Sequence, residues 1–135
     1  PADSPLESPI PFLKIEPVAI ASSTTEPWDY AHLSVWLGCS NLGGAPSAAI
    51  LEVLHVKEGL SFPLNLSSLE RMNFKQLYLP PGASSTEYIA VNLPNSSLGV
   101  LFILSDPLLD PCPRTFASAG ELQAEAGRHI IYYGK

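Results

Sequence analysis

The sequence predicts an all-β protein, built as a two-sheet antiparallel sandwich. Apolar and polar residues alternate in short runs along most of the chain, which is the pattern of half-buried strands. Turn-forming Gly, Pro, Asn and Ser residues separate these runs. Apolar residues make up 46% of the 135 residues and charged residues 15%, so the chain is hydrophobic enough to fold around one core. Only residues 117–126 have a helix-forming composition.

The first 17 residues differ from the rest because they contain prolines at positions 1, 5, 9, 11 and 17. Proline lacks the backbone N–H that a helix or a central strand needs. We therefore expect residues 1–17 to form an extended arm, pinned to its own domain or to a neighbouring subunit, and residues 18–135 to form a single sandwich domain. The apolar positions change phase across Pro17, which predicts a bulge or a bend there.

Residues 31–39 alternate most clearly and predict a strand with one buried face. Residues 48–56 and 99–105 are apolar on both faces. Such strands are either covered on both sides or present their second face to a partner. The other strands are expected at residues 18–22, 74–79, 87–93 and 129–133. From their phases, the side chains expected to point into the core include Leu37, Val91 and Ile103.

The stretch from Leu33 to Asp106 resembles the immunoglobulin-like modules of bacterial and viral surface proteins. The resemblance rests on an alternating strand, an Asn-x-Gly-Gly-x-Pro turn at residues 41–46, and a Leu-Pro-Pro-Gly turn at residues 79–82 before a strand that ends in Asn-Leu-Pro. The arrangement of Trp and Cys residues that marks antibody domains is absent. A jelly roll, which is also a double-sheet fold, is the alternative.

Composition and charge exclude several classes of partner. The net charge is −6 and the seven Lys and Arg residues are dispersed, so neither nucleic acid nor an anionic membrane surface is an expected partner. The longest apolar runs are far shorter than a membrane span, so membrane insertion is not expected, and no signal-peptide pattern is seen. Cys39 and Cys112 lack the spacing of a zinc or redox site, and we interpret them as two buried thiols, with a disulfide as the alternative.

The sequence contains no constellation that predicts catalysis. His32, His55 and Asp29 are candidates for acid–base work, but no nucleophile elbow accompanies them, and both histidines are expected on outer strand faces. Asp106, Asp110 and Glu121 supply too few oxygens for a calcium loop. We therefore expect no enzyme activity, no cofactor and no metal.

Two groups of apolar residues are candidates for contact with a partner. One is the set of apolar arm residues Ile10, Phe12, Leu13 and Ile15, whose burial against a neighbour would hold the arm. The other is the aromatic set Trp28, Tyr30 and Trp36, extended by Tyr132 and Tyr133, which either forms a platform for sugar or protein or seals the end of the core.

These observations lead to a non-enzymatic structural or assembly subunit, located in a virion or on an extracellular surface. The expected role is a viral or phage capsid decoration or minor capsid protein, which forms a homo-oligomer or binds a capsid or surface scaffold. The alternative is a secreted or cell-surface module that binds a glycan or a protein through its aromatic set.

Overall fold

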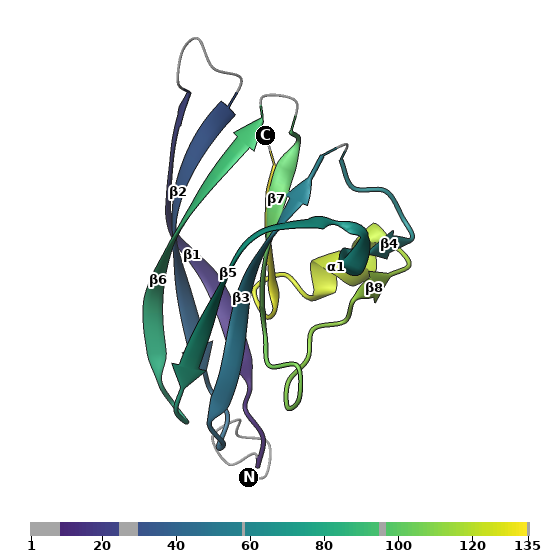
Figure 1. Cartoon of the computed structure of the whole chain (residues 1–135). Coiled ribbons are helices and arrows are strands. Elements are labelled where there is room, and N and C mark those ends of the chain that lie inside the picture. The colour runs from purple at the N-terminus through teal and green to yellow at the C-terminus, as the bar shows by residue number, and fades with distance from the viewer. Residues whose placement is uncertain (1–8, 25–29, 58, 95–96, 135) are drawn as a thin grey trace.

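The computed structural model describes residues 9–24, 30–57, 59–94 and 97–134, and of residues 22–24, 30 and 31 it describes the backbone alone. The strands form two main sheets. Sheet A has the order β1 (Leu13–Thr24), β2 (Tyr30–Asn41) and β6 (Ser84–Pro94), and sheet B has the order β5 (Glu70–Leu79), β3 (Ser47–Val56), β7 (Gly99–Ser105) and β9 (Ile130–Gly134). All pairings within these two sheets are antiparallel. The sheets face each other in Figure 1, which confirms the predicted sandwich.

The core between the sheets follows the predicted alternation. Every second residue of β2 is buried, from Leu33 to Cys39, and Ile89, Val91 and Leu93 of β6 continue this layer. Sheet B contributes the facing layer, which comprises Ala49, Leu51, Val53, Val100, Phe102 and Leu104. Full burial of an aliphatic or aromatic side chain contributes about 1.5 to 3 kcal/mol, so this layer is the main source of stability.

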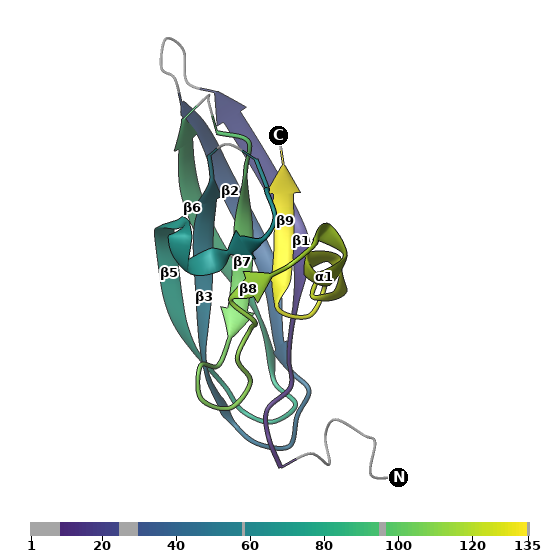
Figure 2. The same cartoon turned by 90° about the vertical axis from the view of Figure 1, so that its right-hand side faces the viewer.

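A second buried cluster lies on the outer face of sheet B. Leu54, Leu101 and Ile103 point outward and are covered by the short ladder of β4 (Leu64–Asn65) and β8 (Thr115–Phe116), by the 3₁₀ turn η2 (Leu66–Ser68) and by α1 (Ala119–Ala124). Figure 2 shows these elements in front of the sheet. Ile103, which was expected in the same core as Leu37 and Val91, is buried in this second cluster instead.

The strand β1 begins earlier than the sequence indicates. Residues 13–17, expected in the arm, pair with β2, and Leu13 and Ile15 are completely buried in the core between the sheets. The pairing register shifts between Pro17 and Ala19, which confirms the predicted irregularity at Pro17. Proline is tolerated there because β1 lies at the edge of sheet A.

Polar contacts join the edges of the two sheets. On one side, Asn73 Nδ2 donates to the backbone oxygen of Ala90 at 3.3 Å, and Lys75 Nζ donates to that of Tyr88 at 3.2 Å. On the other side, the N–H of Ile15 donates to the backbone oxygen of Arg128 at 2.9 Å. These bonds connect β5 to β6 and β1 to the residues that precede β9.

The helix α1 forms where helix-forming composition predicted it. Ser118 caps its first turn by accepting a hydrogen bond of 3.3 Å from the N–H of Glu121, and the Glu121 carboxylate accepts one of 2.8 Å from the N–H of Ala117. Across the described residues, no helix has the length and hydrophobicity of a membrane span.

Candidate functional site

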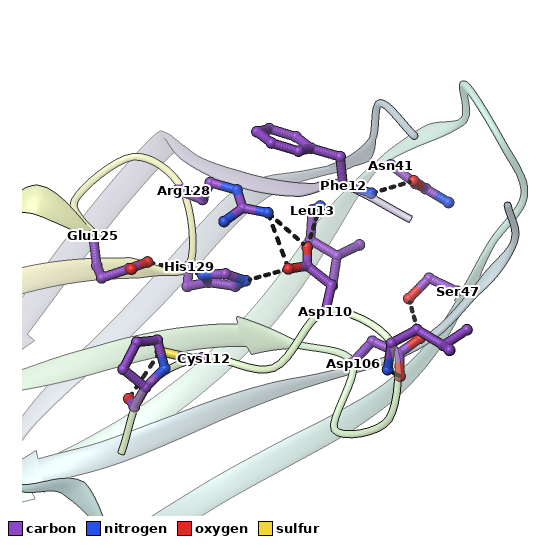
Figure 3. A network of polar contacts seen from close by, with 12 residues as sticks. Phe12, Leu13, Asn41, Ser47, Asp106, Asp110, Cys112, Glu125, Arg128 and His129 are labelled. Atoms are coloured by element: carbon purple, nitrogen blue, oxygen red, sulfur yellow. Dashed lines mark hydrogen bonds and ion pairs between the residues drawn. The ribbon is translucent and has the colours of Figure 1, made fainter. Parts of the chain in front are cut away.

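The most extensive group of buried charges surrounds Asp110, in the loop that follows β7 (Figure 3). Its Oδ1 accepts hydrogen bonds from Arg128 Nη2 at 2.9 Å and from His129 Nε2 at 3.2 Å, and its Oδ2 accepts one from the N–H of Leu13 at 2.8 Å. Nδ1 of His129 lies 2.8 Å from a carboxylate oxygen of Glu125. We call these five residues the Asp110 network. It joins the start of β1, the loop after β7 and the turn before β9.

The pKa values in the Asp110 network shift in opposite directions. Burial alone would lower the pKa of His129, but its hydrogen bonds to Asp110 and Glu125 outweigh burial and raise the pKa above its ordinary value. Burial would raise the pKa of Asp110, but the hydrogen bonds from His129 and Leu13 and the charge of Arg128 lower it. His129 thus lies between two carboxylates, and its hydrogen bonds to them favour the protonated imidazole.

The Asp110 network is suited to holding the fold rather than to catalysis. Both ring nitrogens of His129 are bonded to carboxylates and its side chain is only 2% exposed, so it can neither take a proton from a substrate nor give one. The Arg128 guanidinium also lies 3.9 Å from the centre of the Phe12 ring, in a cation–π contact. Phe12, expected to bind a partner, is thereby held against its own chain.

A second histidine has the surroundings of a serine nucleophile. His55 Nε2 lies 2.8 Å from Ser97 Oγ, and Nδ1 lies 4.0 Å from Glu70 Oε1, which is the order of nucleophile, base and acid in a hydrolase triad. Ser97 is only 1% exposed, however, and its oxygen also lies within 3.5 Å of the backbone oxygens of Val56 and Gly99. A substrate therefore has no access to this oxygen. His55 is buried, contrary to the expectation of an outer position, whereas His32 is exposed and pairs with Asn92.

The acidic residues considered for calcium have other roles. Asp106 is 3% exposed and accepts hydrogen bonds from Ser47 Oγ and from the N–H groups of Leu108 and Leu109, each at 3.0 Å. Asp110 is committed to its network, and Glu121 caps α1. In the part of the chain that the structure describes, no three His, Cys, Asp or Glu side chains gather where they could hold a metal ion.

The two cysteines are separate, buried thiols, as the sequence indicated. Burial raises the pKa of Cys39 and of Cys112 to about 12, so neither sulfur carries the charge that a nucleophile or a metal ligand requires.

The structure brings one predicted aromatic residue together with a residue that the sequence did not single out. Trp36 packs against Tyr88 on the outer face of sheet A, with ring centres 5.0 Å apart, and the hydroxyl of Tyr88 lies 3.2 Å from Ser34 Oγ. Trp28 lies outside the described residues, and so does the side chain of Tyr30. Period-two alternation places Tyr88 on the outer face of β6, but only the register with β2 sets it opposite Trp36.

Among the apolar arm residues, only Ile10 presents a large exposed surface, at 48%. Phe12 is half-buried beneath Arg128, and its N–H donates to Asn41 Oδ1 at 3.1 Å. Leu13 and Ile15 fill the chain's own core, so they are not available to a neighbouring chain as the sequence suggested. The sequence showed the alternation of these two residues, but Pro17 led us to place the start of the sheet after them.

Exposed apolar side chains lie on the uncovered half of the outer face of sheet B and in the loop that follows β7. Phe74 and Tyr78 of β5 are 50% and 70% exposed, and Leu108 and Leu109 of the loop after β7 are 89% and 48% exposed. Ile50 of β3 lies between β5 and this loop. Figure 2 shows this half of the sheet below the elements that cover the second cluster.

Two adjoining hollows run through this surface and share Ile50. One, of about 330 Å³, lies between Ile50, the prolines of the loop, and the side chains of Glu52, Arg71 and Arg114. The other, of about 440 Å³, follows β3 and β5 past Gln76 to Tyr78. We call the two hollows and the exposed Phe74 beside them the sheet B trough. The apolar second face of residues 48–56 was the sequence signal for this surface.

The positive charges of the trough are only partly neutralised. Arg114 Nη1 donates to Glu52 Oε1 at 3.1 Å, and Arg71 Nη1 lies 3.6 Å from Glu52 Oε2. One carboxylate therefore serves two guanidinium groups, which remain 40% and 48% exposed. Arg71 also lies over the Phe74 ring, 4.4 Å from its centre. The trough thus combines apolar walls with two partly exposed arginines at one end.

Comparisons with known proteins find similar structures, but at low sequence identity. No model of a known protein family matches the chain, and no curated protein matches it significantly. A β-glucosidase involved in saponin metabolism from intestinal bacteria aligns over 92% of this chain with 12% identity and a TM-score of 0.48. The β-glucosidase of Kluyveromyces marxianus in complex with glucose aligns over 92% with 11% identity and a TM-score of 0.46.

β-Glucosidase 3B of Thermotoga neapolitana in complex with α-D-glucose aligns over 91% of the chain with 15% identity and a TM-score of 0.38. The chain spans only 15 to 17% of the length of these three proteins.

Proposed function

We propose that this domain is a non-enzymatic assembly subunit, which binds protein neighbours, and copies of itself in particular, through the sheet B trough. The observation that carries the proposal is an exposed apolar surface on one sheet face, where Phe74 and Tyr78 lie beside two hollows that share Ile50. Contiguous exposed apolar surface of this kind is typical of protein contact sites, and aromatic and arginine side chains are the usual energetic centres of such contacts.

The burial of four groups that could act in catalysis supports the non-enzymatic part of the proposal. Ser97 is buried beside His55, the imidazole of His129 is occupied on both sides, and both thiols are buried and uncharged. The narrower role of a viral or phage capsid decoration or minor capsid protein stays a prediction from the sequence.

Sedimentation velocity over a wide range of protein concentration tests the proposal. The wild-type chain is expected to self-associate as concentration rises, and the double variant Phe74→Ser/Tyr78→Ser is expected to remain monomeric. Both residues are exposed, so the fold should be unaffected, and circular dichroism checks this. Val18→Ser, at a 57% exposed position of β1, is the control and should self-associate like wild type. A wild-type chain that stays monomeric throughout would contradict the proposal.

A second candidate function is supported by Trp36 and Tyr88. Their tilted ring pair lies beside the hydroxyl of Ser34 and the exposed His32–Asn92 pair, which together offer aromatic surface and neutral hydrogen-bonding groups. This combination suits a glycan or a small polar patch of a protein. Quenching of tryptophan fluorescence by a panel of neutral oligosaccharides, compared between wild type and Tyr88→Ser, tests it. If no sugar changes the tryptophan fluorescence, glycan binding is refuted and only the assembly function remains.

A further inference from the structure

We infer that the sheet B trough receives the acidic, proline-rich N-terminal segment, residues 1–9, of a neighbouring copy of the chain. This inference rests on the proposed function and specifies what occupies the trough. Four observations support it, namely the chemistry of the segment, the charge of the trough, the length of both, and the place from which the segment leaves the fold.

The N-terminal segment has the composition of a ligand for an aromatic groove. Residues 1–9 read PADSPLESP, with three prolines, Leu6, and two acidic residues, Asp3 and Glu7, and the first basic residue of the chain is Lys14. Proline-rich segments favour the extended polyproline conformation, which loses little entropy on binding. They dock in grooves lined by aromatic side chains, because prolines pack against the ring faces.

The trough complements this composition. Tyr78 and Phe74 supply the aromatic surface, and Arg71 and Arg114 supply one net positive charge beyond the Glu52 carboxylate that they share. The chain as a whole carries a net charge of −6, so an exposed pair of arginines is a local exception that favours an acidic ligand. Asp3 and Glu7 provide the opposite charges, and arginine pairs with carboxylates in strong, directional hydrogen bonds.

The lengths of trough and segment also agree. The trough follows β5 from Arg71 to Tyr78, eight residues that span about 23 Å at roughly 3.3 Å per residue. Residues 1–9 in the polyproline conformation span about 25 Å from first to last at roughly 3.1 Å per residue. Residues 1–9 can therefore follow the whole trough, and residues 10–12 link them to the donor domain.

The anchor of the segment favours exchange between two copies. The N–H of Phe12 donates to Asn41 Oδ1, and Asn41 Nδ2 donates to the backbone oxygen of Leu79, beside Tyr78, at 3.0 Å. The segment thus leaves the fold close to one end of its own trough. Residues 9–12 continue beyond the lower end of both sheets in Figure 2. Two copies related by a twofold axis near this end can exchange their segments reciprocally.

Two full-length variants test the inference. The segment variant carries Asp3→Lys, Leu6→Ser and Glu7→Lys, and the trough variant carries Phe74→Ser and Tyr78→Ser. Neither set removes a buried side chain of the described fold. Each variant alone is expected to be monomeric in sedimentation velocity at concentrations where wild type self-associates. Mixed together, they should form a one-to-one heterodimer, because the trough variant donates an intact segment to the intact trough of the segment variant.

A labelled peptide of residues 1–11 gives an independent measurement. Fluorescence anisotropy should show that the peptide binds the segment variant. A segment variant that also carries Phe74→Ser/Tyr78→Ser should bind the peptide about tenfold or more weakly. The affinity of the peptide should fall as salt concentration rises. Val18→Ser in the segment variant, at a 57% exposed position of β1, should leave binding unchanged. In the segment variant, Arg71→Glu should weaken binding of the wild-type peptide. The same change should strengthen binding of a peptide that carries Asp3→Lys and Glu7→Lys.

The failure of the inference and the failure of the proposed function give different results. If the trough variant is monomeric but the segment variant still self-associates and the peptide does not bind, the trough binds another surface, and the inference is wrong while the proposed function stands. If the peptide binds but the mixed variants form no heterodimer, the segment docks in its own chain, and exchange is refuted. If the trough variant self-associates like wild type, the proposed function itself is wrong.

Discussion

The N–H of Leu13 and the carboxylate of Asp110 form a hydrogen bond of 2.8 Å between positions 97 residues apart. It fixes the start of β1 to the loop after β7, and the same carboxylate binds Arg128 and His129. A single side chain therefore holds three segments that are distant in the sequence. Its removal should affect the whole sandwich rather than one loop.

We expect Asp110→Ala to lower the free energy of unfolding by about 2 to 4 kcal/mol. The change leaves the Leu13 N–H and His129 Nε2 without a partner in a buried site, and breaking a buried pair in this way is costly. The loss should be below that of a fully buried pair because Arg128 is 34% exposed. Urea unfolding measures it, with Glu16→Ala on the exposed face of β1 as the control. Equal stability of both variants would show that the Asp110 network does not hold the fold.

The Asp110 network also predicts how stability depends on pH. His129 has a raised pKa in the folded state, so its contribution is fully present below its ordinary value of 6.5 and is lost as pH rises through the folded value. Asp110 has a lowered pKa, so its contribution is present above its ordinary value of 3.8 and is lost as pH falls through the folded value. Urea unfolding at a series of pH values should give highest stability in mildly acidic solution.

The variant His129→Gln tests whether His129 causes the loss of stability at higher pH. It keeps the ability to form hydrogen bonds but cannot carry a charge, so the decline in stability above neutral pH should become flatter, and the variant should be less stable than wild type in mild acid. An unchanged alkaline slope would assign the decline to another group.

The core between the sheets gives a further prediction. Leu37→Ala should cost about 2 to 4 kcal/mol of stability, because Leu37 is completely buried between the sheets and its truncation leaves a cavity. Val91→Ala should cost less, since a smaller side chain is removed. Val18→Ala is the control, because this side chain is 57% exposed, and its stability should lie close to wild type. Thermal unfolding followed by circular dichroism compares the three.

The two thiols should be unreactive in the folded protein. Burial raises the pKa of Cys39 and of Cys112 to about 12, and alkylating reagents attack the thiolate. Iodoacetamide at neutral pH should leave the intact mass unchanged, whereas in denaturant both residues should be modified. A mass lower by two hydrogen atoms before reduction would instead show a disulfide, and would contradict the separate thiols of the structure.

Alternation along one strand was sufficient to predict the buried face of β2. Residues 33 to 39 repeat with the period of a strand, and one face of that strand meets the core, so phase and burial coincide. The same reasoning failed at Leu13 and Ile15. A proline marks the end of a central strand, but at the edge of a sheet the missing N–H points away from the ladder, and the chain can continue through a bulge.

The Asp110 network and the extent of the trough were beyond what the sequence could predict. Asp110, Glu125 and Arg128 have the appearance of surface charges in two loops, and only the packing of the loop after β7 against the turn before β9 brings them together. The sequence showed that β3 has an apolar second face. Two short strands and a helix cover this face around Leu54, whereas the part around Ile50 is left exposed. Which half is covered depends on the path of the connecting segments.

The contacts from Asn73 and Lys75 to the backbone oxygens of β6 restrict how copies of this domain can join. Exposed strand edges commonly recruit further strands and lead to continuous ribbons and fibrils. Here the carbonyls of Tyr88 and Ala90 already accept hydrogen bonds, and the charged Lys75 amine would lie in the path of an incoming strand. Growth by strand addition along this edge is therefore disfavoured. Under the proposed function, association uses sheet faces instead, where it can stop at a defined number of copies.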